Sequence, residues 1–176
     1  MGTVGASDRI VIRAVVDTSV LVPARSRAEL QGLAQDGAFT AIWSPWIVSE
    51  LYRALTWQWI ESTTFNVTIA NGGIVTACDL TTANWKRCGE SAKRMMEILL
   101  STPNWELVDP RPPYPPAWDT LDDVWDYPIW AAAVAGGAHY VVSNNTHDYP
   151  PVGADGRHVH EGIEYIRGAD FIALLS

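Results

Sequence analysis

Short apolar runs alternate along the chain with longer segments of helical spacing. The short runs are nearly continuously apolar, as expected of strands buried on both faces of a parallel sheet. We predict strands at residues 10–17, 39–43, 105–109, 139–143 and 163–166. A capping box at Ser26–Glu29 predicts a helix that ends at Gly37. Further helices are predicted at 45–60, 82–100, 126–135 and 169–175.

This alternation predicts an α/β fold. Strands that alternate with helices form a mostly parallel sheet covered on both faces, a three-layer α/β/α sandwich. The 176 residues are enough for one domain spanning residues 1–176, with its core at about 10–175. Weak periodicity and a Gly72-Gly73 pair predict an irregular insertion at 61–80. The proline-rich run RPPYPPAW is predicted to be irregular.

The helix at 45–60 is apolar almost all round, which predicts burial on more than one side. Glu50 in its middle needs an explanation, because a buried carboxylate is costly unless it is paired or bound to a metal. Pairing with Arg53, or an exposed orientation of Glu50, is the structural alternative. The chain has nine tryptophans. We expect most of them in the core and the rest on a partner surface.

Charge and composition argue against a strongly basic nucleic-acid-binding protein, a cysteine metal site and a membrane protein. A formal net charge of −8 opposes a broad electrostatic grip on nucleic acid, although cations bound to clustered carboxylates would offset it. Cys78 and Cys88 match no metal motif. No apolar run approaches the roughly 18 residues of a membrane span, and the N-terminal apolar stretch contains charges. We therefore expect no membrane association and a cytoplasmic location.

Three acidic residues stand at the ends of predicted elements. Asp17 ends the first strand, Asp126 begins an alanine-rich helix, and Asp148 follows the strand at 139–143. Each has a structural interpretation alone, as a turn residue, a helix cap or a loop residue. Ligands of parallel sheets bind beyond the carboxyl ends of the strands. Together with Glu50, these groups predict a site for a hard divalent cation, which prefers oxygen ligands.

Other polar groups point to solvated surface. His158 and His160 could bind a metal, but we interpret their segment as a solvated loop. The basic residues of the helix at 82–100 have glutamates one turn away, which favours a solvated, ion-paired face. No Ser–His–Asp arrangement, P-loop or dinucleotide fingerprint is present.

Three segments together resemble the PIN-domain family. They are VVDTSVLV, WIVSELYRAL and DVWDYPIWAAAVAGGAHYVVSNNTHDYP, and the terminal GIEYIRGADFIALL fits the family's last strand and helix. The resemblance covers about residues 10–175. PIN domains are metal-dependent ribonucleases, and many small ones are the toxins of type II toxin–antitoxin pairs.

The resemblance implies a set of metal ligands. By position, Asp17, Glu50 and Asp126 match the family's three acidic residues. Its fourth acidic position often falls where this chain has Asn144-Asn145. A subgroup places Asn there, followed three residues later by an Asp before an aromatic residue and a proline.

Asn145 and Asp148, followed by Tyr149-Pro150, match the subgroup, so either Asp148 or a water completes the shell. Ser19 matches a small polar residue near the metal. Asp122-Asp123, one turn earlier, compete with the assignment of Asp126.

The resemblance thus implies a Mg²⁺- or Mn²⁺-dependent endoribonuclease that acts on RNA. It also implies an antitoxin protein as partner, with the helix at 45–60 in the antitoxin groove or in a homodimer contact. Two alternatives stay open. One is a non-catalytic PIN-like module that binds protein or RNA, which the Asn144-Asn145 pair and the acidic charge favour. The other is an α/β metal hydrolase acting on small phosphoesters.

Overall fold

The computed structural model describes residues 11–70, 82–121 and 124–176, without the side chains of 63–70 and 82–84. Among these residues, six strands form one sheet in the order β3-β2-β1-β4-β6-β5. Only β5 runs antiparallel to its neighbour. The strands are β1 (Ile12–Val16), β2 (Phe39–Trp43), β3 (Trp105–Leu107), β4 (Tyr140–Val142), β5 (His158–His160) and β6 (Ile163–Ile166).

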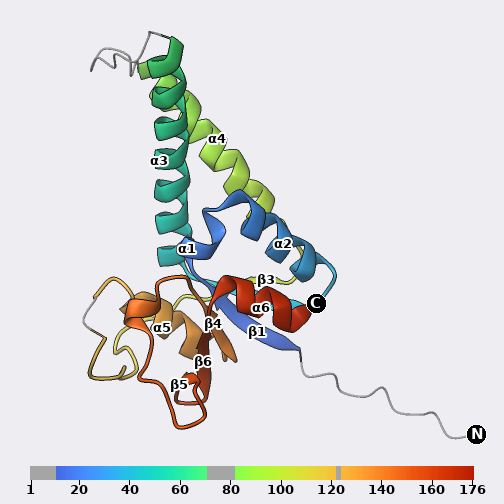
Figure 1. Ribbon diagram of the computed structural model, residues 1–176, viewed down its shortest axis with the longest axis vertical. Helices are drawn as coiled ribbons and strands as arrows, with labels where there is room; N and C mark the ends of the chain where they lie inside the picture. The colour runs from blue at the N-terminus through green and yellow to red at the C-terminus, as the bar shows by residue number, and fades with distance from the viewer. Residues whose placement is uncertain (1–10, 71–81, 122–123) are drawn as a thin grey trace, which may run out of the picture.

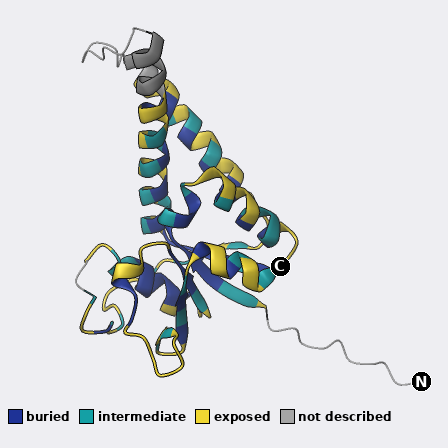
Figure 2. Cartoon of the chain, in the orientation of Figure 1, coloured by how far each residue is buried: buried dark blue, intermediate teal, exposed yellow. Residues whose placement is uncertain are grey.

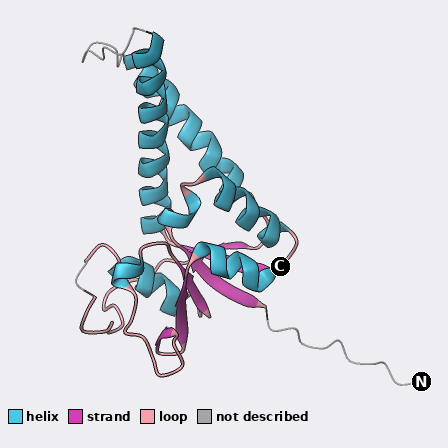
Figure 3. Cartoon of the chain, viewed as in Figure 1, coloured by secondary structure: helices cyan, strands magenta, loops and turns pink. Residues whose placement is uncertain are grey.

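Helices cover both faces of the sheet, which confirms the predicted three-layer α/β/α architecture (Figures 1 and 3). On one face lie α1, α2 and α6, with the base of the α3–α4 pair, and on the other lies α5. The helices are α1 (Thr18–Leu21), α2 (Ala24–Gln35), α3 (Pro45–Ala70), α4 (Thr82–Leu100), α5 (Tyr127–Ala135) and α6 (Gly168–Leu175).

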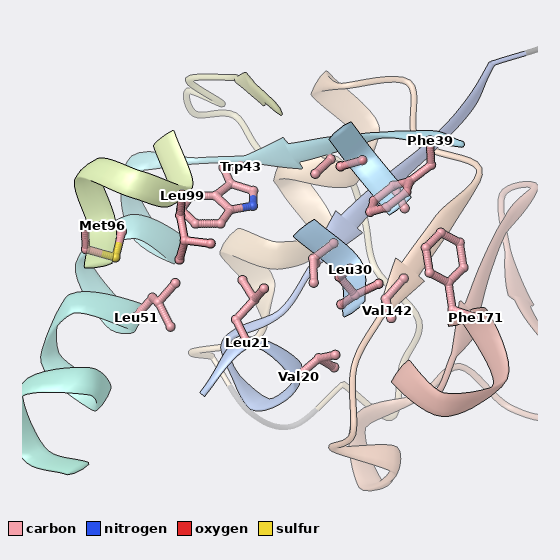
Figure 4. Packing of buried hydrophobic residues seen from close by; sticks show 14 of the residues in the cluster. Val20, Leu21, Leu30, Phe39, Trp43, Leu51, Met96, Leu99, Val142 and Phe171 are labelled. Carbon is pink, nitrogen blue, oxygen red and sulfur yellow. The ribbon is translucent and has the colours of Figure 1, made fainter. Parts of the chain in front are cut away.

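The central strand β1 divides its side chains between two cores. Ala14 and Val16 belong to the core under α1, α2 and α6, whereas Val15 belongs to the core under α5. This follows from the period of two in a strand. Figure 4 shows the first core, in which large apolar side chains from the helices meet the sheet. Its labelled members include Leu21, Leu30, Phe39, Trp43, Leu99 and Phe171.

Helix α5 lies very close to the sheet because its inner face is built from alanine and glycine. Ala132 and Ala133 are buried against Val15, Ile42 and neighbouring strand residues. A Cβ on Gly136 would lie 2.7 Å from Cγ2 of Ile42, so any side chain there would push the helix outward. This close packing fixes the position of Asp126, which immediately precedes α5.

The proline-rich segment is irregular, as predicted, and is tied to α5 by side-chain hydrogen bonds. Tyr127 Oη donates to the carbonyl of Pro115, and Trp130 Nε1 donates to the carbonyl of Pro116 at 3.0 Å. A segment without ladder hydrogen bonds is therefore held against α5, the helix that begins directly after Asp126.

The predicted insertion at 61–80 is wrong for residues 61–70, because α3 continues to Ala70. Residues 71–81 lie outside the described residues. Helices α3 and α4 form a two-helix arm that projects from the body (Figure 1). Leu55 and Ile60 of α3 and Cys88 and Ala92 of α4 are buried. Packing between two helices stabilises a segment whose local pattern is weak.

The arm also corrects the expectation for the tryptophans. Trp43, Trp118 and Trp130 are buried, but Trp57 and Trp59 on the arm are 56% and 41% exposed. The helix is therefore not buried on several sides around Trp57 and Trp59, and Figure 2 shows exposed residues along the outside of the arm. Trp85 and Trp125 are exposed as well. Most tryptophans are thus not fully buried.

Helix α1 and strand β5 are short elements that were not predicted, and several element boundaries differ from the predicted ones. Helix α1 follows β1 directly. Helix α2 begins at Ala24 with Pro23 as its N-cap, so Ser26 lies inside the helix and opens no capping box.

His158 and His160 belong to the edge strand β5 and are half-buried, which corrects their assignment to a solvated loop. The His160 ring lies 5.0 Å from that of Trp130. No helix of the described residues is long and apolar enough to cross a membrane.

Candidate functional site

Asp17 lies at the carboxyl end of β1 and caps α1. Its Oδ2 accepts hydrogen bonds from Ser19 Oγ at 2.5 Å, Ser19 N at 3.4 Å and Ser143 Oγ at 2.8 Å. The residue is only 6% exposed. The bonds donated by described residues all end on Oδ2, so Oδ1 keeps lone pairs for a further partner. The structural role of Asp17 as a cap is therefore real, but it uses one oxygen of the carboxylate.

Glu50 lies on α3, where the apolar pattern made it conspicuous. Its Oε2 accepts a 3.0 Å hydrogen bond from Thr18 Oγ1, and the residue is half-buried. Thr18 follows Asp17 directly. The bond therefore links α3 to the strand end that carries Asp17, and it brings a second carboxylate to the same edge of the sheet.

Asp126 occupies the N-cap position of α5 but does not act as a cap. Its backbone is helical, with φ −86° and ψ −15°, and its side chain accepts no capping hydrogen bond. Its Oδ2 accepts instead a 3.4 Å hydrogen bond from Asn145 Nδ2. The structural interpretation of Asp126 as a helix cap is thus not realised. Its carboxylate is directed to the loop after β4.

Asp148 lies behind Asn145 in this loop. It ends a short 3₁₀ turn, Thr146–Asp148, and is 9% exposed. Asn145 Nδ2 donates to Oδ2 of Asp148 as well as to Asp126, and His147 Nδ1 lies 3.3 Å from Oδ1. Asn145 therefore bridges two carboxylates, which brings Asp148 next to Asp126 through a neutral amide.

These groups meet at a cleft of about 720 Å³. Asp17, Glu50 and Asp126 line it together with Ser19 and Asn145. Its other lining residues are Thr18, Trp46, Ser49, Arg53 and Trp125. Asp148 lines a separate crevice of about 10 Å³, which shares Asp126 and Asn145 with the cleft. The structure thus gathers five of the six predicted site residues at one cleft. Asp148 does not line the cleft, but it accepts a hydrogen bond from Asn145, which does.

Oxygen donors dominate the cleft and fit a hard cation such as Mg²⁺ or Mn²⁺ in type. In the part of the chain that the structure describes, no three acidic, histidine or cysteine side chains stand close enough together to hold a metal ion. The three carboxylates come from different parts of the chain and line one cleft. Asp122-Asp123, the alternatives to Asp126, lie outside the described residues.

The structure adds residues that the sequence did not indicate. Ser143 directly follows β4, and its hydroxyl donates to Asp17 while accepting from the backbone N–H of Asn145 at 3.0 Å. Tyr149 Oη donates to the carbonyl of Ser143 at 2.6 Å, and burial raises the pKa of Tyr149 to about 12. Ser143 carries no motif of its own. The signal that was available is its place at a strand end beside Asn144.

Comparisons with known proteins give little further information. No family model and no curated protein matches the chain. A solved structure that is similar is that of PAE2754 from Pyrobaculum aerophilum, with 15% sequence identity. The match covers 93% of this chain and 89% of that one, with a TM-score of 0.43. A likeness of this size carries no argument about function.

Proposed function

We propose that this chain is a Mg²⁺- or Mn²⁺-dependent endoribonuclease of the PIN type, with the cleft as its active site. One observation carries the proposal: Asp17, Glu50 and Asp126, far apart in sequence, line one cleft of about 720 Å³. The cleft lies beyond the carboxyl end of β1, where parallel sheets bind ligands. Its volume falls in the range of about 300–1,000 Å³ that is usual for ligand sites.

The side chains of the cleft divide into ligands and the groups that orient them. In this proposal the three carboxylates are the metal ligands. Because the described side chains do not stand close enough together to hold an ion as they lie, binding would have to draw the carboxylates closer together. When bound, one or two ions would polarise a phosphodiester and activate water for in-line attack. Ser19 and Ser143 hold one oxygen of Asp17 in place. Asn145 orients Asp126 and keeps Asp148 beside it, so Asp148 contributes negative charge or binds a cation after a small shift of the amide.

The test is cleavage of a labelled RNA in Mn²⁺, with chelator as the blank. Asp17→Asn, Glu50→Gln and Asp126→Asn keep the shape of each side chain and remove its charge. Each should lower the rate by about 100-fold or more, the cost of losing one preorganised charge in a site. Asp36→Asn is the matched control, because Asp36 is exposed at the end of α2. Wild-type rates in Asp17→Asn or Asp126→Asn would sink the assignment.

The resemblance extends the proposal to a cytoplasmic toxin held inactive by an antitoxin protein. Exposed Trp57, Trp59 and Trp85 on the α3–α4 arm support a protein contact there, with an antitoxin or with a second copy. The product of a short overlapping upstream gene should co-purify with the chain and inhibit its nuclease activity. Calorimetry that detects no Mn²⁺ binding up to millimolar concentration would favour the non-catalytic binding module instead.

A further inference from the structure

Two tryptophan rings stack beside the carboxylates of the cleft. The ring centroids of Trp46 and Trp125 are 5.4 Å apart, and the ring planes differ by 14°. The other described aromatic pairs are tilted or edge-to-face. Both rings line the same cleft as Asp17, Glu50 and Asp126. Trp125 directly precedes Asp126 in the chain.

The pair leaves a large flat aromatic surface in contact with solvent. Trp125 is 63% exposed, whereas Trp46 is half-buried on α3. Trp46 therefore packs against one face of the Trp125 ring. Much of the remaining indole surface is open to the cleft or to solvent. A tryptophan kept exposed at the edge of a polar cleft has the shape of a stacking partner for another planar ring.

The charge of the protein makes such a surface significant for RNA binding. Nucleic-acid affinity usually depends on basic groups that neutralise phosphates. Here the formal net charge is −8, and Arg53 is the one cationic side chain among the described residues that line the cleft. Electrostatic attraction of the RNA backbone is therefore weak. Stacking of a base on an aromatic side chain supplies affinity without a basic groove.

We infer that the Trp46–Trp125 pair is a platform that stacks one unpaired nucleobase of the substrate, with Arg53 placed to contact a phosphate. This inference rests on the proposed function, and it deepens it by naming the residues that would hold one unpaired nucleotide beside the carboxylates. In a duplex, both faces of each base are covered by its neighbours, so a base must be unpaired and splayed out to reach a protein ring. The platform lies beside Asp126, so the stacked base is next to the phosphodiester that is cut.

The test measures binding separately from cleavage. Fluorescence anisotropy of a short labelled single-stranded RNA is recorded in chelator, so that no RNA is cut. Trp125→Ala should weaken binding by about 5- to 150-fold, the range expected for one base–aromatic stack. Trp125→Phe should keep most of the affinity. Trp57→Ala, which removes a 56% exposed tryptophan outside the cleft, should bind as the wild type does.

Four further measurements test the same inference. Annealing the RNA to its complement should weaken binding at least as much as Trp125→Ala does. Salt should have little effect, because few phosphates are neutralised. In the cleavage assay, Trp125→Ala should raise KM and leave kcat close to that of the wild type. Circular dichroism of Trp125→Ala should match the wild type, because the ring is largely exposed.

The outcomes separate the two proposals. Unchanged binding in Trp125→Ala, equal affinity for duplex RNA, or no binding of RNA by the wild type would each overturn the platform. Mn²⁺-dependent cleavage together with unchanged Trp125→Ala binding would overturn the platform and keep the nuclease. Loss of binding in Trp125→Ala without any cleavage by the wild type would support the platform and overturn the nuclease.

Discussion

The hydroxyl of Ser143 donates a 2.8 Å hydrogen bond to Oδ2 of Asp17, and this bond joins the ends of β4 and β1. The two residues are 126 positions apart in the chain. Because Ser143 Oγ also accepts from the N–H of Asn145, one hydroxyl sets the positions of Asp17 and of the loop that carries Asn145 and Asp148.

Ser143→Ala should therefore disturb both stability and metal binding. The buried Asp17 carboxylate loses a donor, so the free energy of unfolding should fall by about 1–3 kcal/mol in urea denaturation. Affinity for Mn²⁺, measured by calorimetry, should fall about 10- to 100-fold, as expected when a group that orients a ligand is lost. Ser101→Ala removes an exposed hydroxyl that bonds a backbone carbonyl and is the control. Equal Mn²⁺ affinity in both variants would contradict the role of Ser143.

Replacing the amide that bridges two carboxylates tests the loop after β4. Asn145→Asp places a third charge between Asp126 and Asp148, and repulsion among clustered carboxylates opposes their ionisation. In chelator the variant should lose about 1–3 kcal/mol of stability. Mn²⁺ should raise its Tm by more than it raises that of the wild type. Asn145→Ala, which removes the amide without adding charge, is the comparison. The same Mn²⁺ response in both variants would rule out a cation near this loop.

Arg27 holds the C-terminal end of helix α1 in place. Its side chain is buried, and Nη1 donates to the carbonyls of Leu21 at 2.6 Å and Val22 at 2.7 Å, at the end of α1. Arg27→Met should lower the free energy of unfolding by about 2–3 kcal/mol, because buried carbonyls lose a charged donor. Arg25→Met should leave the free energy of unfolding close to that of the wild type, since the Arg25–Glu29 pair is at the surface. Similar losses in the two variants would show that α1 does not depend on Arg27.

The raised pKa of Tyr149 predicts that the folded protein loses stability in alkaline solution. Burial raises its pKa to about 12 in the folded protein, above the usual value near 10. Between these values the unfolded chain releases the phenol proton and the folded chain keeps it, so the unfolded state is favoured as pH rises. The contribution is complete below about pH 10 and is lost as the pH approaches about 12.

Tyr149→Phe should be less stable at pH 8 by about 1 kcal/mol, because the bond to the Ser143 carbonyl is lost. Its stability should then fall less steeply than that of the wild type between about pH 9 and pH 11. Burial also raises the pKa of Tyr165, but this residue is present in both proteins, so its effect cancels. Urea denaturation across this pH range measures both slopes. Parallel slopes would contradict the prediction.

The local hydrophobic pattern predicted the positions of those elements whose own residues carry a clear apolar pattern. Strand β6 lies at the predicted residues, and α5 differs by one residue at its start. The close packing of α5 on the sheet at Gly136 was not predicted and is a finding of the structure. The distal half of α3 was missed, because its helix depends on packing against α4. Strand β5 was missed because its three residues form a strand only by pairing with β6.

For the candidate site, the sequence alone placed Asp17, Asp126 and Asp148 at the ends of elements and Glu50 in a helix. It could do so because caps, strand ends and apolar periodicity are local properties of the chain. Only the tertiary structure decided which of these groups share the cleft, because distances between elements are set by packing and by bonds such as Ser143–Asp17 and Thr18–Glu50. The same packing set Asp148 behind Asn145.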